Sequence, residues 1–111
     1  MLILKIDTRR IIDAASFHDV LQETFGFPDT YGRNLDALAD SLTHLDDPSA
    51  KMSAVNVSSG EHVTLVLNYA EAFSLKRPVL WEQLLDVVAF VNWRRIEKNQ
   101  SPVICLAYHR H

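Results

Sequence analysis

The chain has 111 residues, of which 48% are hydrophobic and 23% are charged, and 14 acidic against 11 basic side chains give it a net charge of -3. These values are those of an ordinary globular domain, and they argue against a phosphate-binding protein and for a basic partner. A single cysteine excludes an internal disulfide, and no apolar run reaches the roughly 18 residues of a membrane span. The start of the chain lacks the layout of a signal peptide, so a cytoplasmic location is expected.

The first third of the chain predicts a strand followed by a helix. Residues 2–6 form an apolar run that predicts a strand, and residues 13–25 carry apolar side chains at offsets of three and four, which predicts a helix. Asp13 or Ser16 is a suitable N-cap for this helix, and Gly26 is a suitable end.

The central segment, residues 34–45, predicts a second helix with two distinct faces. Asn34 is a good N-cap, and one stripe is made of leucines at helical spacing, namely Leu35, Leu38, Leu42 and Leu45. Asp36 and Asp40 are four residues apart on a face that points away from this stripe. Two like charges at this spacing destabilise an isolated helix by about 0.2–0.5 kcal/mol. An ordinary solvated face is the better interpretation of such a pair taken alone, and the surrounding sequence shifts the balance towards function.

The segments that follow alternate again between polar connection, strand and helix. Residues 46–61 predict a long polar connection that is either mobile or folded locally, with a short strand at residues 54–57. Residues 62–67 are rich in β-branched side chains and predict a strand. A short helical turn is expected at residues 69–73, before a long helix at residues 79–98.

The last helix and strand complete the predicted fold. The helix at residues 79–98 has a wide apolar arc, which indicates either deep packing, favoured by base rates, or a surface used partly as an interface. The closing strand at residues 102–108 contains Cys105, which we expect to be buried. Helical crossovers imply parallel strands, so we expect one small α/β domain over residues 1–111, with a largely buried three-stranded parallel sheet and about four helices in two or three layers.

Several kinds of chemistry find little support in the sequence. The three glycines are isolated, so no phosphate-binding loop is present, and the arginine doublets are scattered, which disfavours nucleic-acid binding. His109 and His111 lie on either side of Arg110 at the end of the chain, where a frayed tail is expected and not a metal site. His18 is expected at the surface or its boundary. An enzyme could use Asp36 and Asp40 as general acid and general base. Both project from one convex helix face, however, where solvent keeps both carboxylates ionised, so we do not expect catalysis.

The central segment nevertheless resembles a known family. The tract Tyr31–Leu38 and its surroundings are similar to the barstar family, small proteins that inhibit secreted bacterial ribonucleases; the similarity also includes His18, Leu21, Pro28, Asp40, Leu42 and Thr43. The match is clear over about residues 11–45, and the order of strands and helices downstream agrees more loosely. The segment at residues 46–61 looks like an insertion directly after the matched helix.

The resemblance implies an inhibitor that is not an enzyme and that needs no cofactor or metal. In the family, this loop and helix (residues 29–46 here) plug the ribonuclease active site, where their carboxylates occupy the pocket for substrate phosphate. The implied partner is a basic ribonuclease or a related toxin, bound by a chain expected to be monomeric, with no nucleic acid or membrane as partner. The partner-binding residues that it implies are Asp29, Tyr31, Gly32, Arg33, Asn34, Asp36, Asp40, Thr43 and His44.

Some residues depart from the family pattern. Thr30, Ala39 and Leu45 stand where members often carry aromatic residues, and Arg33 adds positive charge where a basic ribonuclease would dock. On the last helix, an ungapped match places Arg95 where an acidic contact residue is expected. The alternative interpretation is therefore an interaction or scaffold domain that keeps the barstar fold without inhibiting a ribonuclease.

Overall fold

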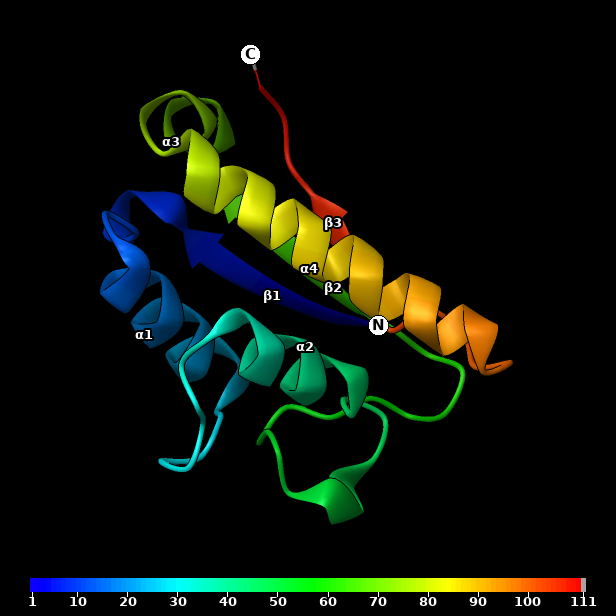
Figure 1. Ribbon diagram of the computed structural model, residues 1–111. Coiled ribbons are helices and arrows are strands. Elements are labelled where there is room, and N and C mark those ends of the chain that lie inside the picture. Colours follow the sequence, from blue (N-terminus) through cyan, green and yellow to red (C-terminus); the bar gives the residue numbers. More distant parts are fainter. Residues whose placement is uncertain (111) are drawn as a thin grey trace.

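The computed structural model describes residues 1–110 and contains a three-stranded parallel sheet with the order β1-β2-β3 (Figure 1). The strands are β1 (Leu2–Asp7), β2 (Val63–Asn68) and β3 (Ile104–Ala107). β2 lies in the centre and pairs in parallel with both neighbours. The parallel arrangement predicted from the helical crossovers is confirmed.

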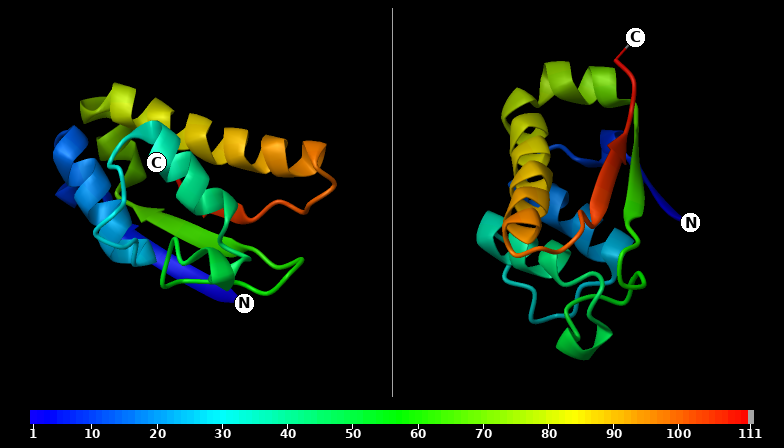
Figure 2. Two further views of the ribbon diagram at one scale, coloured as in Figure 1. Left: turned by 60° about the horizontal axis from the view of Figure 1, so that its bottom comes forward. Right: turned by 90° about the vertical axis from the view of Figure 1, so that its right-hand side faces the viewer.

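Four α-helices lie to one side of this sheet, and the third of them lies at the end of the strands, not over the sheet face (Figure 2). They are α1 (Ala14–Phe25), α2 (Leu35–Thr43), α3 (Ala70–Lys76) and α4 (Pro78–Glu97). The predicted helices are all present, and their ends differ from the expected ones by up to three residues. The fold is therefore the expected α/β class, with two layers.

The two faces of the sheet have very different surroundings. In β2, Val63, Leu65 and Leu67 point towards the helices and are buried, while the residues between them are more exposed. On the opposite face Ile3 and Cys105 are exposed. The expected burial of Cys105 is therefore wrong, because its strand lies at the sheet edge and the residue points to the open face. The expectation of a largely buried sheet is correct for the helical face only.

Local caps explain where α1 and α2 begin and end. The Asp13 side chain accepts a hydrogen bond from the backbone N–H of Ser16, and the Ser16 hydroxyl oxygen accepts one from the backbone N–H of Asp13. This reciprocal capping box shows that Asp13 is the N-cap. Gly26 ends α1 in the left-handed conformation, with φ of 69°. The side chain of Asn34 accepts from the N–H of Ala37 at 2.8 Å, so the predicted N-cap of α2 is confirmed.

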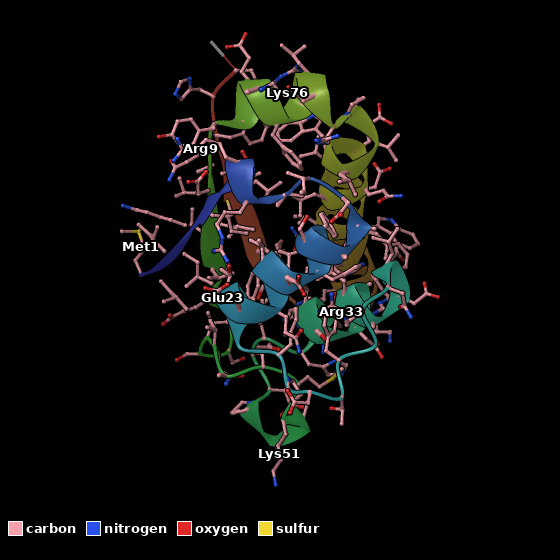
Figure 3. The ribbon with its side chains drawn as sticks, turned by 90° about the vertical axis from the view of Figure 1, so that its left-hand side faces the viewer. Met1, Arg9, Glu23, Arg33, Lys51 and Lys76 are labelled. Atoms are coloured by element: carbon pink, nitrogen blue, oxygen red, sulfur yellow. The ribbon has the colours of Figure 1, made fainter. Side chains whose placement is uncertain are left out.

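The long connection after α2 is folded locally. It contains a 3₁₀ turn at Pro48–Ala50, and Lys51 lies near its far tip (Figure 3). The strand predicted at residues 54–57 is absent. Its backbone N–H groups bond instead to the ends of neighbouring helices: Ala54 donates to the carbonyl of Gly26 at 3.0 Å, and Val57 donates to that of Leu45 at 2.9 Å.

The long helix α4 has one buried and one exposed apolar face. Its inner face packs into the core with Trp81, Leu84, Val88 and Val91. Its outer face exposes several large apolar side chains, which include Phe90, Trp93 and Ile96. Core packing thus accounts for only part of the apolar arc. Among residues 1–110, no helix combines the length and apolar character that a membrane span requires.

Candidate functional site

The two carboxylates of α2 lie on the solvent side of the helix, opposite its leucine stripe. Leu38 and Leu42 are buried in the core, whereas Asp36 and Asp40 are exposed. Asp36 lies in the first turn, where the helix dipole favours negative charge. The leucines fix the orientation of the helix and leave both carboxylates available for a partner.

The loop before α2 is supported from below by a buried polar pair. Nδ1 of His18 lies 2.7 Å from the hydroxyl oxygen of Tyr31, and both residues are 7% exposed. The expectation that His18 lies at the surface or its boundary is wrong, because the loop folds over it and Tyr31 satisfies its ring nitrogen. The Tyr31 ring also packs against Phe27, with ring centroids 4.8 Å apart. Tyr31 therefore shapes the site from inside the fold.

Burial changes the protonation of both groups in this pair. Desolvation, together with the nearby Arg33 charge, lowers the pKa of His18 below its usual value. Burial raises the pKa of Tyr31 to about 12. At neutral pH the pair is therefore uncharged, as its apolar surroundings require.

The Arg33 side chain reaches back to α1, although 39% of it remains exposed. Its guanidinium lies 2.7 Å from the Asp19 carboxylate and donates to the Gln22 side chain at 3.0 Å and to the Ala15 carbonyl at 3.1 Å. The positive charge that the sequence places beside the carboxylates is thus balanced by Asp19. The same contacts fasten the loop to α1.

A second arginine, on α4, lies beside the Asp40 carboxylate. Nη2 of Arg94 is 3.8 Å from Asp40 Oδ1 and donates to the hydroxyl of Thr43 at 2.8 Å. Its Nε is buried and has no hydrogen-bond partner within residues 1–110. At 3.8 Å the ion pair is loose, so Asp40 keeps most of its capacity to accept hydrogen bonds.

Arg95 holds the end of α2 against α4. It is 3% exposed, and it donates two hydrogen bonds to the Asp46 carboxylate, at 2.7 and 3.0 Å. It also donates to the carbonyls of Thr43 and Ser101, each at 2.8 Å. The hydrogen bonds from Arg95 hold the pKa of Asp46 below its usual value. Arg95 therefore cannot serve as the partner contact that the ungapped match would assign to it.

The remaining predicted residues line the same side of the molecule. Asp29, Gly32 and Asn34 are exposed in the loop before α2, while Thr43 and His44 are half-buried at its end. Nδ1–H of His44 donates to the carbonyl of Asp40 at 2.8 Å and so helps to close the helix. A pocket of about 350 Å³ opens between the ends of α2 and α4; its lining includes Asp40, His44 and Arg94.

Sequence reasoning missed the roles of Arg94 and Arg95. The signal available was two adjacent arginines in the last turn of an apolar helix, in a chain with unpaired aspartates near residues 40–46. Residues 43 and 95 are far apart in the sequence, so their contact depends on how α2 packs on α4. No pattern within either helix indicates that packing.

The site is an exposed surface that carries the two carboxylates of α2. Within residues 1–110, no group of three or more histidine, cysteine or acidic side chains could hold a metal ion, and His111 lies outside the described residues. Exposed carboxylates on a rigid helix can accept charge-assisted hydrogen bonds from arginine or lysine side chains of another molecule.

Comparisons with known proteins identify the family of the chain. A match of 53% identity over 38 residues joins the chain to the protein named "Putative ribonuclease inhibitor YrdF" of Bacillus subtilis (strain 168). This match covers 34% of the chain and 42% of that relative, so it spans less than half of either protein. The family model described as Barstar (barnase inhibitor) matches residues 1–106, nearly the whole chain. The chain therefore belongs to the Barstar family of barnase inhibitors.

Proposed function

We propose that this chain binds a basic bacterial ribonuclease or a related toxin and blocks its active site with the loop and helix at residues 29–46. The observation that carries the proposal is the exposure of Asp36 and Asp40 on a helix whose opposite face is locked into the core. Two carboxylates one helical turn apart offer oxygens in the way that successive phosphates of RNA do. They can therefore occupy the cationic pocket that holds substrate phosphate.

Electrostatics support both the affinity and the rate of such an encounter. A net charge of -3 attracts a basic protein, and complementary charge accelerates association in a salt-dependent way. Removing a carboxylate strands the partner's buried cations, which typically weakens a complex by about 2–5 kcal/mol. Within this proposal the chain is a single-domain, cytoplasmic monomer that uses no cofactor, and residues 46–61 are an insertion that supports the end of α2.

Inhibition of RNA cleavage tests the proposal. Barnase and a panel of other basic secreted bacterial ribonucleases are each titrated with the chain while cleavage of a fluorogenic RNA is followed. We expect stoichiometric inhibition of at least one enzyme. Asp40→Ala should weaken it by at least 30-fold, or about 2 kcal/mol.

The matched control is Glu71→Ala, which removes an exposed carboxylate on α3 and changes the net charge by the same amount. It should inhibit like the wild-type chain. If Asp36→Ala and Asp40→Ala both inhibit like Glu71→Ala, the assignment of the site is wrong.

A scaffold domain without ribonuclease inhibition is the second candidate. It is favoured by the absence of exposed aromatic side chains on α2 and directly after it, where Ala39 and Leu45 are both buried. Protein interfaces commonly rely on such aromatic anchors. Failure of the chain to inhibit any enzyme of the panel at micromolar concentration would favour this candidate.

A further inference from the structure

Two aromatic side chains project into solvent from the outer face of α4. Phe90 is 45% exposed and Trp93 is 58% exposed, and their ring centroids are 6.2 Å apart. Trp81, the other tryptophan, is buried. Tryptophan and other aromatic residues are the side chains that most often anchor protein interfaces, and both of these side chains remain accessible to a partner.

The aromatic pair is continuous with the carboxylates of α2. α2 and α4 pack side by side along the same face of the sheet (Figures 1 and 2). The Arg94 guanidinium bridges them, because it lies 3.8 Å from Asp40 and its central carbon is 5.2 Å from the ring centre of Phe90. Asp40, Arg94, Phe90 and Trp93 thus form an uninterrupted row across two helices.

The loop and α2 are too small to make a complete interface alone. Protein partners usually contribute about 20–30 residues each to a stable interface. Between residues 29 and 44 only seven residues are exposed: Asp29, Thr30, Gly32, Arg33, Asn34, Asp36 and Asp40. None of the seven is aromatic, so both the area and the apolar anchors have to come from a neighbouring element.

We propose that Phe90 and Trp93 on α4 contact the ribonuclease that binds at α2, and that this ribonuclease presents an apolar patch beside its cationic pocket. This inference rests on the proposed function and names the chemistry of the partner more closely. Phe90 and Trp93 fill the apolar patch, while Asp36 and Asp40 meet the cations. Arg94 lies between the two regions, so a ribonuclease that carries a positive charge opposite Arg94 would bind more weakly.

Charges around the aromatic pair agree with a basic partner. Asp86 and Glu97 are exposed on α4, four residues before Phe90 and four residues after Trp93, and therefore border the pair at both ends. A second copy of the chain is a poor occupant. In a twofold dimer the same patch meets itself, so these acidic groups and those of α2 would face their own copies.

Fluorine NMR tests the inference directly. The chain is labelled with 5-fluorotryptophan, which gives separate signals for Trp81 and Trp93, and Trp93→Phe assigns them. Each ribonuclease of the panel is then added without label. For the enzyme that binds, we expect the Trp93 signal to shift or broaden, while the Trp81 signal stays in place.

Affinity measurements give a second readout. Phe90→Ser with Trp93→Ser should weaken binding by ten-fold or more without changing the unfolding midpoint, whereas Leu75→Ser should leave affinity unchanged. Leu75 is a suitable control because it is 67% exposed and lies on α3.

The outcomes separate the inference from the function on which it rests. Binding that depends on Asp40, with an unmoved Trp93 signal and an unaffected double variant, overturns the role of the aromatic pair and leaves the proposed function standing. No binding to any enzyme of the panel removes the proposed function and the role of the aromatic pair together. Concentration-dependent dimerisation that the double variant abolishes shows that a second copy occupies the patch, which also overturns the inference.

Discussion

Truncation of Arg95 to alanine should destabilise the protein far more than truncation of its neighbour Arg94. Arg95 is 3% exposed and makes four hydrogen bonds, two to the Asp46 carboxylate and two to backbone carbonyls. Its removal leaves a carboxylate and the last turn of α2 without donors. Arg94 makes one hydrogen bond to a protein side chain, and 32% of its own side chain is exposed.

The size of the effect follows from how well water can replace the arginine. Loss of one partner of a buried ion pair destabilises by about 3–5 kcal/mol. The side chain of Asp46 is 20% exposed, so water can partly solvate the stranded carboxylate. We therefore expect about 3 kcal/mol for Arg95→Ala, at the lower end of that range, and less than about 1 kcal/mol for Arg94→Ala.

Urea unfolding, followed by far-ultraviolet circular dichroism and by tryptophan fluorescence, measures this difference. With a urea dependence of about 1.5–2 kcal/mol per molar, the midpoint of Arg95→Ala should fall by about 1.5–2 M. Because the pKa of Asp46 is lowered in the folded chain, the unfolded chain binds the proton first, and the free energy of unfolding should decline as the pH falls below the normal pKa of aspartate and through the lowered value. Equal and small losses for the two arginine variants would refute the role given to Arg95.

Two further predictions concern α1 and the loop that follows it. Because the folded pKa of His18 is lowered, the unfolded chain binds the proton first, and stability should fall as the pH drops below about 6.5 until the folded value is passed. The slope of unfolding free energy between pH 7.5 and 5.5 should be smaller in His18→Gln, and an unchanged slope would contradict this cause. Gly26→Ala should destabilise by about 3 kcal/mol, because φ is 69° and the new Cβ would lie 2.5 Å from that of Ala54. Gly60→Ala has φ of 85° but open space around the new Cβ, and chemical unfolding should show a loss of only about 1 kcal/mol; equal losses would mean that the contact with Ala54 does not matter.

The sequence was sufficient where the determinants are local. The Asn34 cap and the leucines of α2 lie within a dozen residues of each other, and the helix that they predict is present with its carboxylates exposed. The strands of the sheet were likewise predictable from short apolar runs. Helical crossovers then determined their parallel direction.

Features that depend on packing between distant segments were not predictable. Cys105 lies in an apolar run that looks like a buried strand, but its exposure depends on which sheet face the helices cover. His18 is buried only because the loop with Tyr31 folds over it. Arg95 pairs with Asp46 across 49 positions of sequence, and the charges present in both segments do not indicate which of them meet.

The central claim is that the carboxylates of α2 occupy the phosphate pocket of a ribonuclease. Competition with a nucleoside monophosphate at the ribonuclease active site tests it most directly, because both ligands would need the same cations. The apparent dissociation constant of the chain should rise in proportion to nucleotide concentration, and this dependence should weaken in Asp36→Asn with Asp40→Asn. Simultaneous binding of the chain and the nucleotide, with no effect of either on the other, would contradict the claim.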